Sequence, residues 1–212
     1  MTTTTDTPFL RELTTQREKI RKAREANEAR ARIPAAAIAA AAIHEASHAV
    51  AAVLAGGRIT DLTLTPHDPD HMGRCTYDGR LSASAEAQVT FAGAVGEARW
   101  TYGKMPSVRE VRSVLDGHCA ADGTGDLDKL TASGEPLPFE VGRLIETTWP
   151  AVQTIARHLV AHDRADHATV CAALGVPETD AHLSAQAAAI HAGLAPTPQK
   201  LPAGSTHSPA RR

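Results

Sequence analysis

Aromatic residues and cysteines are scarce in this sequence of 212 residues. Phenylalanine, tryptophan and tyrosine make up 3% of it, so a buried core must consist mainly of alanine, leucine, valine and isoleucine. Such small aliphatic side chains favour closely packed helices over a β-sandwich or barrel. The three cysteines, Cys75, Cys119 and Cys171, show no CxxC spacing, which argues against a disulfide framework and against a cysteine-based zinc site.

The sequence also lacks a strong charge bias and a long hydrophobic run. Its formal net charge of −2 provides no electrostatic footprint for DNA or RNA. The N-terminus has no basic start followed by an apolar segment. The longest apolar run, residues 33–43, is interrupted by Pro34 and is about half as long as a membrane span. We therefore expect a cytoplasmic protein with no membrane partner and no nucleic-acid partner.

Composition divides the chain into three parts. Residues 1–33 are polar and are expected to form a partly helical or disordered arm, whereas residues 34–192 carry the periodic apolar segments of one domain. Residues 193–212 are rich in proline, serine and glycine, and are expected to be a disordered tail. In the arm, opposite charges four residues apart favour a solvated helix, and a basic arm that contacts nucleic acid or a partner is the alternative. These pairs are Glu18 with Lys22 and Arg24 with Glu28.

One long helix is expected between Pro34, which suits a first helical turn, and the glycines at 56 and 57, which suit its end. The segments "RITDLTLTPH" and "GRCTYDG" follow it and predict a short β-ribbon. Apolar spacing predicts further helices, with a break or kink at Pro150. Their ranges are 84–102, 107–115, 126–131, 139–162, 168–174 and 179–192. The expected fold class is mainly α.

The motif "HEASH" lies inside the long helix and contains His44, Glu45 and His48. Residues four apart share one face of a helix, so both imidazoles can bind one ion at the roughly 2.0 to 2.1 Å that zinc prefers. Glu45 then lies beside the metal, where its carboxylate can take a proton from a zinc-activated water and pass it to a leaving amine. The spacing indicates metal-assisted hydrolysis by a helical, zincin-like metallopeptidase domain with its β-ribbon after the HExxH helix.

A catalytic zinc takes three protein ligands, so a third must come from elsewhere. The position that a metzincin would fill with histidine is Leu54, which excludes that family. Asp126 follows the glycine-flanked turn "DGTGD" at the start of a helix, where it is either a zinc ligand or a simple N-cap. The other downstream candidates are His67, Asp68, Asp70, His71, Glu86 and Glu97.

Four segments occur in the order typical of one protease family: "IHEASHAVAAVL", "ITDLTLTP", "FAGAVGEARWTYG" and "GTGDLDKL". Over residues 35–174 the chain resembles the peptidase domain of the FtsH family of zinc metalloproteases. The resemblance implies that Asp126 is the third zinc ligand, and it aligns Glu97 with the first glutamate of an A-E-E run. A carboxylate at Glu97 is then expected to fix the ring of a ligand histidine, and a plain surface role is the alternative.

The chain departs from the FtsH pattern in two ways. It has no G-x-x-x-x-G-K-[ST] loop, so ATP-driven unfolding is not implied. Ser47, Ala98 and Gly125 stand where the family has glycine, a second glutamate and asparagine.

The sequence as a whole predicts a stand-alone zinc endopeptidase with one Zn²⁺ per chain, which cleaves flexible or unfolded protein segments without ATP. A catalytically impaired binding module, or a regulatory protease with one dedicated client, is the alternative. An extended substrate is expected to pair with one strand of the ribbon. The residues of that strand are Leu62, Thr63, Leu64 and Thr65.

Overall fold

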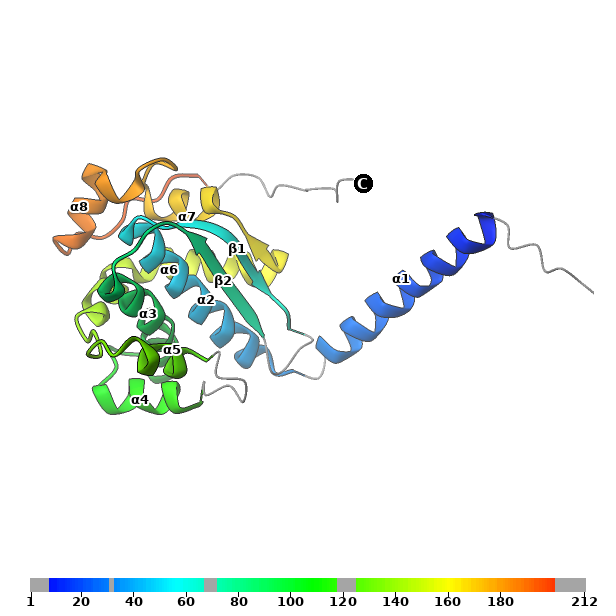
Figure 1. Cartoon of the computed structure of the whole chain (residues 1–212), viewed down its shortest axis with the longest axis horizontal. Coiled ribbons are helices and arrows are strands. Elements are labelled where there is room, and N and C mark those ends of the chain that lie inside the picture. The colour runs from blue at the N-terminus through cyan, green and yellow to red at the C-terminus, as the bar shows by residue number, and fades with distance from the viewer. Residues whose placement is uncertain (1–7, 31–32, 67–71, 118–124, 201–212) are drawn as a thin grey trace, which may run out of the picture.

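The structure is a computed structural model, and it describes residues 8–30, 33–66, 72–117 and 125–200 (Figure 1). Helices dominate the described residues, and one small sheet lies among them, which confirms the predicted fold class. The elements in chain order are α1 (Pro8–Arg30), α2 (Ala35–Ala55), β1 (Arg58–Leu64), β2 (Gly73–Asp78), α3 (Ala83–Tyr102), α4 (Val108–Gly117), α5 (Asp126–Ser133), α6 (Val141–His162), β3 (Arg164–Ala165), α7 (His167–Leu174), the 3-10 turn η1 (Ala181–Leu183) and α8 (Ala185–His191).

Helix α2 is the centre of the domain and packs against α3, α6 and the sheet. It begins directly after Pro34 and ends at Gly56, which adopts a left-handed conformation with φ 100° and so stops the helix as predicted. From Ala42 to Leu54 every residue is buried. Many of these are alanines, which let the neighbouring helices approach closely. The core is therefore assembled around the helix that carries the HExxH motif.

Helix α2 is also long and apolar enough to cross a membrane. Its most apolar window has a mean hydropathy of 1.5, but 78% of that window is buried inside the domain. Core helices of soluble proteins share these properties.

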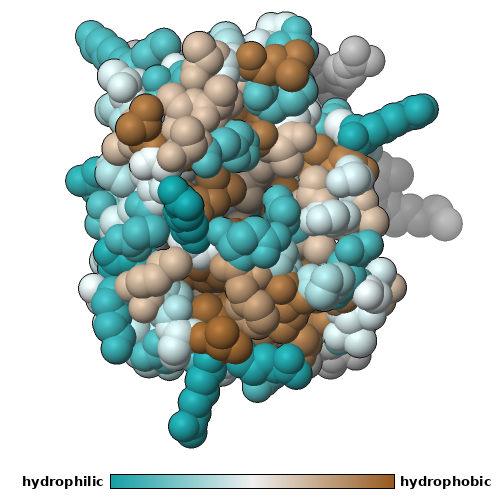
Figure 2. Space-filling model, turned by 90° about the vertical axis from the view of Figure 1, so that its left-hand side faces the viewer, coloured by the Kyte–Doolittle hydropathy of each residue, from teal (hydrophilic) through white to brown (hydrophobic). Residues whose placement is uncertain are grey.

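Figure 2 shows the face of the domain on the side of α3, α4 and α8. On this face, polar side chains divide the apolar surface into patches.

The sheet has three antiparallel strands in the order β2-β1-β3, one more than the predicted ribbon. Strand β1 pairs with β2 along its length, and Leu62 and Thr63 also pair with β3. Strand β3 has only two residues, Arg164 and Ala165, too few for an alternating pattern to reveal it. Because β3 pairs with the second edge of β1, β1 is the central strand of the sheet.

Helix α1 stands apart from the domain (Figure 1), and its described side chains are largely exposed. Both predicted ion pairs are present, with 3.7 Å between Lys22 and Glu18 and 2.9 Å between Arg24 and Glu28. Arg21 adds an ion pair to Glu25 at 2.7 Å. The helix and both ion pairs predicted for this arm are therefore present, and whether the arm contacts a partner stays a prediction. Such exposed pairs contribute little to stability, because water and salt screen them.

Two predicted helices and the tail differ from expectation. Helix α6 continues through Pro150 without a break. The predicted helix 179–192 is divided at Ser184, whose hydroxyl accepts from the backbone N–H of Ala187 and caps a new helix. Residues 193–200 are not a disordered tail: Pro196 is buried, and the backbone N–H of Gln199 donates to the carbonyl of Ala172 at 2.8 Å. The rest of that predicted tail, 201–212, lies outside the described residues.

Candidate metal centre

Helix α2 presents two histidines side by side on its buried face. His44 is 6% exposed and His48 8% exposed. Their rings meet edge to face with centroids 4.6 Å apart, and the two Nε2 atoms are 2.9 Å apart. One turn of helix holds them in this relation. Two nitrogens therefore converge on one point.

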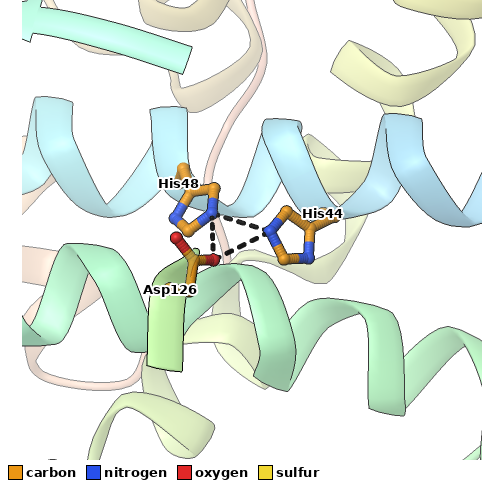
Figure 3. Close-up of side chains that lie close together, drawn as sticks. All are labelled: His44, His48 and Asp126. Carbon is orange, nitrogen blue, oxygen red and sulfur yellow. Dashed lines mark hydrogen bonds and ion pairs between the residues drawn. The ribbon is translucent and has the colours of Figure 1, made fainter. Parts of the chain in front are cut away.

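Asp126 brings an oxygen to the same point from α5 (Figure 3). Its Oδ2 lies 3.0 Å from Nε2 of His44 and 3.1 Å from Nε2 of His48. Gly125 is the N-cap of α5, and Asp126 is the first residue inside the helix, so the alternative that Asp126 is a simple N-cap is wrong. The three donor atoms form a buried group placed to bind one metal ion.

Each histidine is oriented by a contact to its other ring nitrogen. Nδ1 of His44 lies 3.0 Å from Oε2 of Glu97, and Nδ1 of His48 lies 2.7 Å from the carbonyl oxygen of Val89. Both acceptors favour a proton on Nδ1, which leaves the Nε2 lone pairs facing Asp126. Both Glu97 and Val89 belong to α3. The Val89 carbonyl was not predicted, since a backbone acceptor carries no sequence signal.

A lysine forms an ion pair with the carboxylate of Asp126. Nζ of Lys129, one helical turn further along α5, lies 3.4 Å from Oδ1 of Asp126, and the lysine side chain is 58% exposed. The two oxygens of Asp126 therefore have different surroundings. Oδ1 faces an ammonium group at the surface, whereas Oδ2 faces the two histidines.

The charges in this group are strongly coupled. Burial lowers the pKa of His44, but hydrogen bonds to Asp126 and Glu97 outweigh it and raise that pKa to about 10. Burial raises the pKa of Asp126, yet the two histidines outweigh it and hold that pKa well below its ordinary value. Without metal, these contacts therefore favour the protonated form of His44. A metal ion must compete with that proton, because only a neutral imidazole is a ligand.

Glu45 lies next to the donor group but is not part of it. It is 9% exposed, and burial raises the pKa of its carboxyl above the ordinary value, although the neighbouring His44 opposes the shift. A carboxylate with a raised pKa is better suited to accept and return a proton than one in open water.

The donor set fits zinc. Around a tetrahedral zinc with bonds of 2.0 to 2.1 Å, ligand atoms are about 3.3 Å apart, and the three donor atoms here are separated by 2.9, 3.0 and 3.1 Å. A small outward movement of the side chains suffices. Two imidazole nitrogens and one carboxylate oxygen are also ligands that zinc accepts, with a fourth position left for water.

Two glycines allow α3 to pack directly against the metal centre. A Cβ on Gly93 would lie 2.7 Å from Nε2 of His44 and still closer to Nε2 of His48. A Cβ on Gly96 would overlap Oγ of Ser47, whose hydroxyl donates to the carbonyl of Ile43 at 2.8 Å. Glycines three apart on a helix share a face, so their spacing in "FAGAVGE" was a readable signal of close helix packing. Ser47, a departure from the FtsH pattern, is accommodated by Gly96.

The Gly96→Ala variant is expected to lose about 1 to 2 kcal/mol of unfolding free energy, because overpacking costs more than the improved helix propensity returns. Adding Ser47→Gly removes the overlapping hydroxyl, so the double variant should lose less than the two single variants together. Chemical denaturation with a chelator present measures this without a contribution from metal. Gly117→Ala is the matched control, since a Cβ there meets nothing within 4 Å. Equal stability of Gly96→Ala and wild type would contradict the proposed packing.

Other predicted site residues are not part of the donor group. Glu86 is exposed in the first turn of α3. The remaining candidates, His67, Asp68, Asp70 and His71, lie outside the described residues.

The prediction that an extended substrate pairs with Leu62–Thr65 is wrong. Leu62 and Thr63 pair with β2 on one side and with β3 on the other. The backbone N–H of Leu64 donates to Asp163, and that of Thr65 donates to Met72. Leu62 and Leu64 also have their side chains in the core. Strand β1 therefore offers no free edge along this segment.

Fold and site together define a zinc metallopeptidase-like domain. Residues 29–110 match the model of a family of zinc metallopeptidases described as Peptidase M50B-like. The match includes α2, both long strands and α3, and hence His44, Glu45, His48 and Glu97, but it ends before Asp126. No match was found among curated proteins. The family match and the buried His-His-Asp group agree with the predicted single zinc ion.

Proposed function

We propose that this domain is a zinc-dependent endopeptidase that hydrolyses peptide bonds in flexible or unfolded protein segments without ATP. The observation that carries the proposal is the buried convergence of His44, His48 and Asp126 within 3.1 Å of one another. Glu45, adjacent in sequence to His44, supplies a carboxylate beside that group. Three ligands and a neighbouring carboxylate are what peptide hydrolysis by a zinc enzyme requires.

In the proposed mechanism, His44, His48 and Asp126 hold the metal, and Glu97 orients His44. A bound zinc ion supplies Lewis acidity, which lowers the pKa of a water molecule and polarises the substrate carbonyl. The carboxylate of Glu45 accepts a proton from the attacking water and then donates it to the departing amine. The burial of Glu45, which raises its pKa, favours both the uptake and the return of that proton.

We propose that the substrate binds in an extended form along β2 rather than β1. Strand β2 is at the edge of the described sheet, and its first residue, Gly73, lies against Glu45: a Cβ there would be 2.7 Å from Oε1 of that carboxylate. An extended peptide added to this edge would pass close to the metal centre. Only a flexible or unfolded segment can offer its backbone in this way, which supports the proposed substrate class.

The closer relationship to the FtsH family stays a prediction. It is supported by the order of the four motif segments and by the part that Asp126 takes in the donor group, whereas the family model that matches is Peptidase M50B-like. The cytoplasmic location, and the lack of membrane and nucleic-acid partners, also stay predictions.

The proposal is tested by incubating the full chain, loaded with zinc, with an unfolded protein such as casein and with a stably folded protein. We expect internal cleavage of casein alone, no effect of added ATP, and loss of cleavage after the metal is removed by a chelator. Zinc added back should restore the rate. Cleavage that persists in the metal-free chain would contradict a zinc mechanism, and cleavage that requires ATP would contradict the stand-alone activity.

A further inference from the structure

An open apolar groove lies between α2, α3 and α6. It has a volume of about 460 Å³, which is within the range of sites that hold small organic ligands. Six of its eight lining residues are apolar, and the two polar ones, Gln153 and Arg157, both belong to α6. The donor group of the metal centre does not line it, so the groove is a separate feature of the domain.

The groove exists because small side chains lie where α2 and α6 pack together. Ala39 and Ile43 line it from α2, and Ala156 and Val160 line it from α6. Each pair is about one helical turn apart, so its members share a face. Protein interiors are normally packed without large voids, but an alanine from each helix leaves a hollow here that larger side chains would fill.

Two large apolar side chains in this groove are exposed to solvent. Trp100, from α3, is 42% exposed and Val160 is 39% exposed, so a ligand that covered them would remove apolar surface from water. The residues of α6 that line the groove extend from Gln153 to Ala161, which is about 12 Å along the helix. This elongated apolar surface matches an extended alkyl chain.

A guanidinium group lies beside the apolar surface. Arg157 donates from Nε to the carbonyl of Gln153 at 3.2 Å and from Nη2 to the hydroxyl of Thr154 at 3.3 Å. These contacts hold the guanidinium against α6 and leave its Nη1 without an acceptor among the described residues. Within the same part of the chain, no carboxylate forms an ion pair with Arg157. The groove therefore offers a charged donor, which suits a carboxylate.

We propose that this groove binds a long-chain fatty acid, with its alkyl chain along α6 against Trp100 and its carboxylate accepting from Arg157. One cation beside an elongated apolar surface matches a ligand with one negative charge and one linear apolar chain. A peptide fits less well, because its backbone N–H and C=O groups would lie unpaired on apolar side chains. The inference does not depend on the proposed peptidase activity, since the groove contains no residue of the donor group.

Calorimetric titration of the full chain with octanoate, decanoate and dodecanoate, each below its critical micelle concentration, tests the groove. We expect one fatty acid per chain, with an affinity that rises by up to about fourfold for each added methylene until the groove is full. Decanol should bind at least about tenfold more weakly than decanoate, because a hydroxyl offers no charge to Arg157.

The Arg157→Gln variant tests the contact with the carboxylate. It should bind decanoate about tenfold more weakly than wild type and decanol equally well, because only the charged contact is removed. Arg109→Gln is the matched control, since Arg109 is exposed on α4 and does not line the groove. This control should bind both compounds as wild type does.

The Ala39→Leu variant tests the apolar part of the groove. Its larger side chain fills the hollow, so it should bind both compounds at least about tenfold more weakly and should also raise the thermal midpoint. Ala36→Leu makes the same change at an exposed position of α2 outside the groove, and should leave binding unchanged. Circular dichroism confirms that each variant is folded before it is titrated.

Three results would overturn the fatty-acid site. The first is decanoate binding that is unchanged in both Arg157→Gln and Ala39→Leu. The second is loss of decanoate binding in Asp126→Ala, which would place the carboxylate at the metal centre instead. The third is binding to phosphatidylglycerol vesicles without saturable binding of free decanoate, because the groove would then contact a membrane surface.

Discussion

The Glu45→Gln variant is expected to keep its zinc and to cleave casein about 10³-fold more slowly than wild type, within the range that a positioned general acid and base contributes. Glutamine has nearly the size and shape of glutamate, so it fills the same buried space against Gly73. It cannot accept a proton from water at neutral pH. The measurement pairs the initial rate of casein cleavage with zinc content by mass spectrometry on the same preparation.

The control for Glu45→Gln is Glu86→Gln, which makes the same chemical change at an exposed position of α3. We expect this control to retain both zinc and activity. If Glu45→Gln cleaved casein at the wild-type rate, Glu45 would not be the general base. If the zinc-loaded wild type itself cleaved nothing but bound protein partners stably, the domain would be a catalytically impaired binding module.

The Asp126→Ala variant is expected to reduce the tightly bound zinc from about one ion per chain to less than about one-tenth, because a site with three protein ligands is left with two. The methyl group of alanine also leaves His44 without the carboxylate that raises its pKa. The two histidines should then lose their fixed orientation as well as their third partner. Zinc content after exhaustive dialysis without added metal measures the loss, and casein cleavage should disappear with it.

Asp128→Ala is a matched control for Asp126→Ala. Both aspartates lie in the first turn of α5, so each substitution removes one negative charge from the same helix end. Asp128 contributes no atom to the donor group, and its variant is expected to keep its tightly bound zinc. Equal zinc loss in both variants would mean that the charge of the helix end, and not a ligand at Asp126, holds the metal.

Features set by local geometry could be predicted from the sequence. His44 and His48 share a face because any helix puts residues four apart together, and proline and glycine mark where that helix begins and ends. The part of Asp126 in the donor group was harder to predict, because this residue lies 82 residues along the chain from His44. The order of motif segments pointed to it, while its local sequence was equally that of an N-cap.

Other features depend on tertiary packing and leave no signal in the local sequence. The two-residue strand β3 covers one edge of β1, and that pairing moves the proposed substrate edge to β2. The carbonyl of Val89 and the missing side chains of Gly93 and Gly96 act on the histidines only because α3 lies directly against α2. Residues 193–200 are ordered by contacts with α7, although their composition is typical of a disordered tail.

The sequence by itself thus determined the helical character of this protein and the two histidines and glutamate of its centre, because those depend on spacings of a few residues. Only the tertiary structure showed which edge of the described sheet is left unpaired and how close α3 comes to α2. It also brought to the two histidines the carboxylate of Asp126, which the order of the motif segments had indicated. These depend on contacts between segments far apart in the chain. Such contacts depend on the free energy of packing the whole domain. No single segment of the sequence determines that free energy.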